Sequence, residues 1–111
     1  RDYIHVIDLA DAHLKCLDKI MSNRKNKKSD CLIYNLGNDL GISVKEILLS
    51  VEKVTGNKVP FKYASRREGA PPMLFASSNK IRNELCWNPK FSNIDKIIYH
   101  AYKWELKKIN N

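Results

Sequence analysis

Three short runs of β-branched and aromatic residues alternate along the chain with stretches of helical periodicity, and this alternation constrains the fold more than any other feature. The runs span residues 3–7, 32–36 and 59–63. Runs of this length and composition are typical of β-strands, and strands that alternate with helices are typical of α/β proteins. We therefore expect an α/β unit in which short strands alternate with about four helices.

The first two helical stretches carry recognisable start and stop signals. Asp8 is expected to cap the first helix, and Ser43 with Glu46 forms the capping box of the second, which Gly56 is expected to end. The apolar residues of the first helix recur at helical spacing, at Leu9, Ala12, Cys16 and Ile20.

Two further helices are predicted in the last third of the chain. Ser77 is expected to cap a short helix that carries Ile81 and Leu85, and Ser92 with Asp95 resembles a second capping box. The final helix has one apolar side, made by Ile94, Ile97, Ile98, Ala101 and Trp104.

Length and composition indicate one small unit, residues 1–111. The hydrophobic fraction is 43%, and no apolar run approaches the roughly 20 residues that cross a bilayer, so no membrane partner is expected. The chain begins at Arg1 without an initiator Met, directly in a strand-like run, so we expect it to be a portion of a longer protein.

A net charge of +8 raises nucleic acid as a partner. The densest basic run, residues 24–28, contains no aromatic residue that could stack on a base, so we interpret it as a solvated loop. Cys16, Cys31 and Cys86 are widely spaced and lack a CxxC pair, and we expect them to be buried thiols.

The sequence contains no complete catalytic machinery. It has no GxGxxG turn for a dinucleotide pyrophosphate, and Tyr99 and Lys103, which have Tyr-x-x-x-Lys spacing, lie on the amphipathic last helix. Catalytic, cofactor-binding and metal-binding residues are therefore expected to be absent from this chain.

The strongest candidate for ligand binding is the segment 65–72, which combines Arg66 and Arg67 with Gly69 and two prolines. The planar guanidinium group matches phosphate oxygens, and glycine lets a backbone approach a ligand closely. A pair of arginines on a solvated turn is the alternative interpretation.

Three motifs in order, RDYIHV at residues 1–6, YNLG at 34–37 and RREG at 66–69, closely resemble the C-terminal part of UDP-glucose 4-epimerases, which belong to the extended short-chain dehydrogenase/reductase family. The resemblance implies a substrate-binding portion whose NAD-binding Rossmann domain is N-terminal and missing from this chain. It further implies a cytoplasmic isomerase that interconverts UDP-glucose and UDP-galactose through a 4-keto intermediate, and it allows a homodimer of the full-length form.

The resemblance also implies the substrate-binding residues. Arg1 matches a diphosphate-contacting arginine, Tyr3 lies beside the UDP site, and Arg67 matches the second arginine of the RREGD motif. The complete set that we predict is Arg1, Tyr3, Arg67, Glu68, Gly69, Ala70 and Leu74.

Two positions bear on substrate choice. Ala70 stands where the family motif ends in an aspartate that accepts hydrogen bonds from the ribose hydroxyls. The loss of that acceptor reduces the binding free energy by on the order of 1 kcal/mol. Leu74 stands where residue size influences whether an N-acetylated sugar fits. The alternatives are a non-catalytic nucleotide-sugar-binding module, a related nucleotide-sugar dehydratase or epimerase, and a basic nucleic-acid-binding protein.

Overall fold

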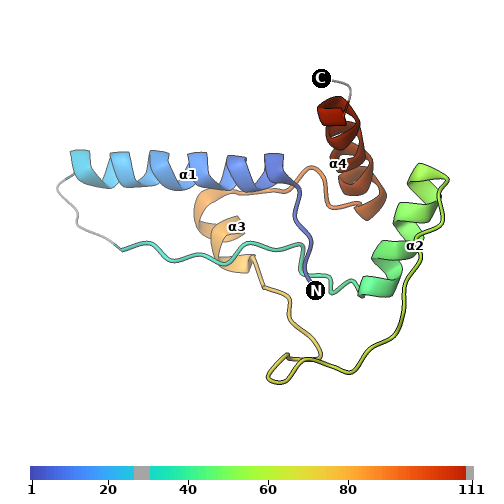
Figure 1. Cartoon of the computed structure of the whole chain (residues 1–111). Helices are drawn as coiled ribbons and strands as arrows, with labels where there is room; N and C mark the ends of the chain where they lie inside the picture. The colour runs from blue at the N-terminus through green and yellow to red at the C-terminus, as the bar shows by residue number, and fades with distance from the viewer. Residues whose placement is uncertain (27–30, 110–111) are drawn as a thin grey trace.

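The computed structural model describes residues 1–26 and 31–109, which form four α-helices joined by long irregular segments (Figure 1). The helices are α1 (Val6–Lys25), α2 (Val44–Thr55), α3 (Asn79–Leu85) and α4 (Ile94–Ile109). Helix α1 packs against α3, and α2 packs against α4. The part of the basic run at 27–28 lies outside the described residues, while Arg24 and Lys25 form the last turn of α1.

The α/β prediction is wrong, because the described residues contain no strand. Residues 6 and 7 belong to α1, and 59–63 form an irregular segment whose side chains are mostly exposed. The side chains of 32–36 do alternate between exposed and half-buried positions, as in a strand, but this segment pairs with no other segment that the structure describes. A strand exists only through ladder hydrogen bonds to another strand, and a β-prone sequence does not supply that partner.

The capping signals of α2 were read correctly. Ser43 Oγ accepts the N–H of Glu46 at 3.1 Å, and the Glu46 carboxylate accepts the N–H of Ser43 at 2.8 Å. Gly56 ends the helix in the left-handed conformation, at φ +74°. Both signals act within three or four residues of the helix ends that they define.

The other predicted caps are displaced. His5 caps α1, since its Nδ1 accepts the N–H of Ile7 at 3.1 Å, and Asp8 lies in the first turn. Helix α3 begins after Ser78 rather than Ser77. At α4, the Asn93 side chain accepts the N–H of Lys96 at 3.1 Å in place of Ser92.

Asp95, which was predicted to complete the α4 capping box, instead joins α4 to α2. Its carboxylate accepts the hydroxyl of Ser50 and pairs with Lys53 Nζ at 2.5 Å. The bonds from Lys53 and Ser50 hold the pKa of the Asp95 carboxyl below its usual value.

A small core forms where α1, α3 and the segment after α3 meet. Ala12, Ile81 and Trp87 are buried there, and half-buried apolar side chains surround them. Trp87 Nε1 donates to the main-chain oxygen of Asp8 at 3.0 Å. The buried Asp8 carboxylate accepts the N–H groups of Lys90 and Phe91 at 2.8 and 2.9 Å, which fixes the start of α1 to the chain that leads into α4.

The molecule is extended for its length. Its radius of gyration is 17.7 Å, with principal extents of 55 × 39 × 21 Å, whereas a compact chain of this size has a radius of gyration of about 13 Å. Within the described ranges, no helix is both long and apolar enough to span a membrane.

The prediction of three buried thiols is wrong for two of them. Cys31 and Cys86 are exposed, and only Cys16 is half-buried, where burial raises the pKa of its thiol. Cys31 directly precedes the unpaired segment 32–36, and Cys86 occupies the left-handed position that ends α3.

Two histidines join the N-terminus of α1 to α4. His5 Nε2 and His100 Nδ1 lie 2.8 Å apart, and the His5 ring stacks on Phe91 at 4.4 Å between centroids. Because His5 Nδ1 accepts from Ile7, the proton of the neutral ring must be on Nε2, from which it donates to His100. Protonation of either ring would place a hydrogen where this arrangement needs an acceptor.

We expect acid to loosen this contact. Burial, and next the neighbouring His100, lower the pKa of His5 below 6.5, against a weaker opposing effect of Asp8. The contribution of neutral His5 to the free energy of unfolding is therefore complete above about pH 6.5, and it is lost as the pH falls through the lower pKa that His5 has in the folded state. In that pH range, unfolding takes up as much as about one proton. Urea unfolding of the full-length protein between pH 7.5 and 5 measures this dependence.

His100→Ala should reduce that pH dependence. His13→Gln is the matched control, because His13 is exposed and, among the described residues, its ring bonds only to the Leu9 carbonyl of its own helix. If the free energy of unfolding of His100→Ala kept the same pH dependence, the assignment of that dependence to the His5–His100 contact would be wrong.

Candidate functional site

The N-terminal arginine is held between two segments that are distant in the sequence. The main-chain nitrogen of Arg1 donates to the Ile42 carbonyl at 2.7 Å, and Ile42 N–H donates to the Arg1 carbonyl at 2.8 Å. The Arg1 side chain donates from Nη1 to the Pro71 carbonyl at 3.2 Å. Arg1 therefore connects the approach to α2 with the end of the arginine-containing segment.

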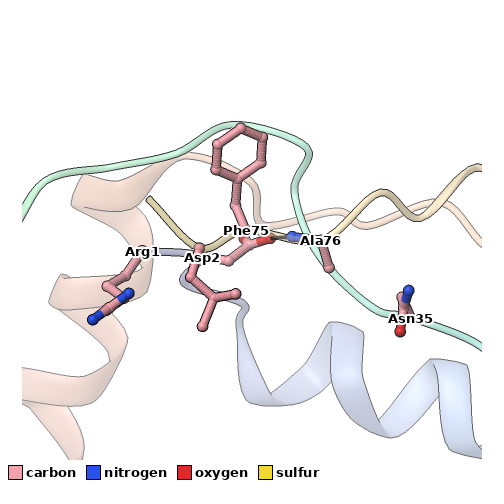
Figure 2. Close-up of a pocket in the computed structure, with 6 residues that line it drawn as sticks. Arg1, Asp2, Asn35, Phe75 and Ala76 are labelled. Atoms are coloured by element: carbon pink, nitrogen blue, oxygen red, sulfur yellow. Dashed lines mark hydrogen bonds between the residues drawn. The ribbon is translucent and has the colours of Figure 1, made fainter. Parts of the chain in front are cut away.

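Asp2 joins the same segments through its carboxylate. One oxygen accepts the N–H of Asn38 at 3.0 Å. The other accepts the N–H of Ala76 at 3.1 Å (Figure 2). Gly37 permits this approach, since a Cβ at that position would collide with the Asp2 carboxylate and lie 2.8 Å from the Ala76 carbonyl oxygen. A glycine here is a steric requirement.

An open pocket of about 410 Å³ lies beside this junction. Figure 2 shows the side chains that border it, which come from the N-terminus, the extended segment before α2 and the chain leading into α3. Its lining residues are Arg1, Asp2, Asn35, Leu74, Phe75 and Ala76. The pocket thus combines one guanidinium group with an apolar wall.

A smaller hollow of about 180 Å³ is also lined by Arg1 and includes Glu46. The hydrogen bonds from Ser43 keep the pKa of the Glu46 carboxyl below its usual value, so this carboxylate stays ionised. A fixed negative charge disfavours an anionic ligand. Asp2 likewise places a carboxylate in the larger pocket, so charge alone does not distinguish the two hollows, and the larger one differs from the smaller chiefly in its volume.

The predicted site residues fall into two groups. Arg1 and Leu74 line the same pocket, whereas Arg67, Glu68 and Gly69 lie on an exposed turn that does not line it. Ala70 is half-buried and closes that turn, with its N–H donating to the Arg67 carbonyl at 3.2 Å. Gly69 has a φ of +73°, which favours glycine.

The remaining predicted residues differ in what surrounds them. The Arg67 guanidinium makes no hydrogen bond or ion pair within the described part of the chain, and so is free to meet a ligand. Tyr3 is half-buried, and its main-chain oxygen accepts from Asn38 Nδ2 at 2.5 Å. Its side chain does not line the pocket.

Four pocket residues were missed by sequence reasoning, namely Asp2, Asn35, Phe75 and Ala76. Asp2 and Asn35 lie inside the recognised motifs, so their position in RDYIHV and YNLG was an available signal. Phe75 packs so closely on Gly41 that a Cβ there would lie 2.9 Å from the ring, and only the folded structure reveals this contact.

Comparison with known proteins gives a consistent result. No family model matches the chain. Over 104 residues it is 46% identical to the UDP-glucose 4-epimerase of Streptococcus mutans, an alignment that covers 94% of this chain and 30% of that protein. Thus the chain spans about a third or less of the relatives it matches.

The structural comparison agrees. A crystal structure of a UDP-glucose 4-epimerase superposes with a TM-score of 0.89 at 42% identity, covering 100% of this chain and 32% of the other. The Bifidobacterium longum enzyme in complex with NAD⁺ and UDP superposes with a TM-score of 0.85 at 34% identity, covering 99% and 31%. The resemblance read from the motifs is confirmed, and these 111 residues correspond in sequence and in fold to a portion of a UDP-glucose 4-epimerase.

Proposed function

We propose that this chain is the UDP-sugar-binding portion of an NAD-dependent UDP-glucose 4-epimerase, which interconverts UDP-glucose and UDP-galactose through a 4-keto intermediate. The observation that carries the proposal is the pocket in which Arg1 and Leu74 meet, in a chain whose similarity to these epimerases extends over its length. In this proposal the full-length protein is cytoplasmic and homodimeric, and its ligands are UDP-sugars rather than nucleic acid or a membrane.

In this proposal, Arg1 and Arg67 both bind the diphosphate. Arg1 is oriented by its bond to Pro71, and Arg67 presents an uncommitted guanidinium on the turn that precedes it. Because they come from different segments, they can meet the diphosphate from two sides with charge-assisted hydrogen bonds. Leu74 then faces the sugar, Tyr3 lies beside the UDP site, and Ala70 leaves a ribose hydroxyl to water.

The sequence contains no GxGxxG turn of the kind that holds a dinucleotide pyrophosphate. Side chains also cap the N-termini of α1, α2 and α4, where such a group would otherwise bind. We therefore assign NAD, which takes up and returns the hydride at the sugar C4, to an N-terminal Rossmann domain of the full-length protein. The residues of this chain bind and orient the nucleotide.

Arg67→Ala in the full-length protein is expected to weaken UDP binding about tenfold, since a hydrogen bond to a charged group contributes about 1.5–3 kcal/mol and water compensates part of it. Isothermal titration with UDP measures the affinity, and conversion of UDP-galactose measures turnover.

Arg66→Ala is the matched control, because Arg66 carries the same charge one position earlier and is assigned no contact. An equal loss of UDP affinity in both variants would show that net charge causes the effect, and it would contradict a specific contact between Arg67 and the diphosphate. Tight UDP binding without turnover would favour the non-catalytic binding module.

A further inference from the structure

Asp39 has an unusual backbone conformation for a residue with a side chain. Its φ is +58°, in the left-handed region that glycine, asparagine and aspartate tolerate better than other residues. A residue keeps such a conformation only where the surrounding contacts hold it, and residues of this kind gather at functional sites. Asp39 directly follows Asn38, whose N–H bonds to Asp2 at the edge of the larger pocket. The contacts of Asp39 therefore bear on that pocket.

The Asp39 carboxylate is held at the start of α3. Its Oδ1 accepts the N–H of Ser78 at 2.8 Å, and its Oδ2 accepts the Ser78 hydroxyl at 2.9 Å. The Arg82 guanidinium lies 3.3 Å from Oδ2 and donates from Nε to Ser78 Oγ at 2.8 Å. The bond from the Ser78 N–H, more than any other contact, keeps the pKa of the Asp39 carboxyl below its usual value. An ionised carboxylate is thus fixed in one orientation by the buried Ser78.

The bonds between Asp39 and Ser78 join two segments that meet beside the pocket. Residues 74–76 line the pocket, and Ser78 follows them by two positions. On the other segment, Gly41 follows Asp39 by two positions and lies so close to Phe75 that a Cβ on it would be 2.9 Å from the ring. The Phe75 ring borders both hollows. A movement of Asp39 relative to Ser78 would therefore displace this apolar wall.

The same segment also holds the backbone of Arg1. Ile42, the residue after Gly41, exchanges two main-chain hydrogen bonds with Arg1, at 2.7 and 2.8 Å. The Asp39 carboxylate anchors this segment three residues earlier, so it fixes the backbone from which the Arg1 guanidinium extends. The guanidinium group and the apolar wall come from different parts of the chain, and both are positioned from this one anchor.

We infer that Asp39 is a positioning residue of the UDP-sugar site, which sets where the Arg1 guanidinium and the Phe75 ring lie and touches no substrate itself. It acts through its bonds to Ser78, and its role in binding rests on the proposed function, in which the pocket holds the nucleotide-sugar. Asp39 lines neither hollow. Its replacement therefore changes substrate binding only through the segments that it joins.

Asp39→Ala in the full-length protein is expected to raise the KM for UDP-galactose and the Kd for UDP about tenfold, since hydrogen bonds to a charged group are lost. The change in kcat should stay within about twofold, because a displaced pocket weakens binding equally in the ground and transition states. Steady-state kinetics and isothermal titration measure these values. Urea unfolding confirms that each variant is folded under the assay conditions.

Two replacements at the same position separate the carboxylate from the backbone. Glycine adopts a φ of +58° readily, so Asp39→Gly keeps the conformation and should still raise KM as much as Asp39→Ala does. Asparagine also tolerates this conformation and keeps one acceptor oxygen for the Ser78 N–H, so Asp39→Asn should restore most of the affinity. A normal KM in Asp39→Gly would overturn the inference, because the backbone conformation alone would then suffice.

Further variants test the route by which Asp39 acts. Asp39→Ala combined with Ser78→Ala should raise KM no more than Asp39→Ala alone, because both changes remove the same contact. Gly41→Ala leaves the carboxylate in place but forces the Phe75 ring to shift, and should raise KM as well. If Asp39→Ala does not fold, Asp39→Asn and Gly41→Ala carry the test. Glu105→Ala is the matched control, because it removes a carboxylate that pairs with a lysine on α4, which borders neither hollow.

A folded Asp39→Ala with unchanged KM, or with a fall in kcat alone, would overturn the inference. A merely structural role would lower the free energy of unfolding and leave the KM of the folded enzyme as it was. A wild-type protein that converts UDP-galactose, with Asp39→Ala equal to it, defeats only this inference. A wild-type protein that binds no UDP defeats the proposed function. Backbone hydrogen exchange of residues 38–42 and 74–78, which needs no ligand, then tests the anchor by itself, and unchanged exchange in Asp39→Ala would refute it.

Discussion

Trp87→Ala is expected to lower the free energy of unfolding by about 3–5 kcal/mol, the usual cost of removing a large buried aromatic side chain. Trp87 is 1% exposed and lies at the centre of the core, with the Arg82 guanidinium 5.5 Å from the ring. Its indole N–H also holds the Asp8 carbonyl, so truncation weakens the link between α1 and the segment leading to α4. Urea unfolding of the full-length protein, followed by circular dichroism, measures the loss.

Two further variants separate packing from hydrogen bonding. Trp87→Phe retains an aromatic ring but removes the donor to Asp8, and should cost less than Trp87→Ala. Tyr63→Ala truncates an aromatic side chain that is 83% exposed, and a change within about 0.5 kcal/mol is expected there. If Trp87→Ala were as mild as Tyr63→Ala, the core assignment would be wrong.

The helices could be predicted well from the sequence because their signals are local. The capping box at Ser43 and the glycine stop at Gly56 involve residues three or four positions apart, and both were found in the structure. The position of the α1 cap could not be predicted in this way. His5 serves as the cap while it also stacks on Phe91 and meets His100, and these partners lie 86 and 95 residues away.

The strands could not be predicted because a strand depends on its partner. Residues 32–36 have the composition of a strand and alternate in exposure, yet no other described segment pairs with them. The same pattern of β-branched and aromatic residues at 59–63 belongs to an exposed connection. The β-propensity of the sequence thus identified segments that could pair as strands. It could not reveal whether the described residues contain a second strand to pair with them.

The candidate site was half predictable. The motifs led to Arg1 and Leu74, which do share a pocket, although they are 73 residues apart. They did not lead to Asp2, whose importance comes from accepting N–H groups 36 and 74 residues away. An aspartate beside a candidate ligand-binding arginine has no sequence signature for a structural role of this kind.

Asp2→Ala is expected to raise the KM of the full-length protein for UDP-glucose by about 100-fold, or about 3 kcal/mol, while kcat changes little. Both carboxylate oxygens accept main-chain N–H groups, and hydrogen bonds to a charged group contribute about 1.5–3 kcal/mol each. Without them, the segments that carry Arg1 and Leu74 lose their common anchor. Weaker binding that is equal in the ground and transition states appears in KM rather than in kcat.

Asp2→Asn and Asp2→Glu test whether position or charge matters. Asparagine keeps one acceptor oxygen at the same reach and should give an intermediate KM. Glutamate keeps the charge, but its extra methylene has no room where the carboxylate already fills the space that Gly37 leaves, so it should not rescue binding. Asp18→Ala, an exposed change on α1 far along the helix, should leave KM unchanged. A fall in kcat with unchanged KM in Asp2→Ala would instead place Asp2 in the chemical step and refute its role as a positioning residue.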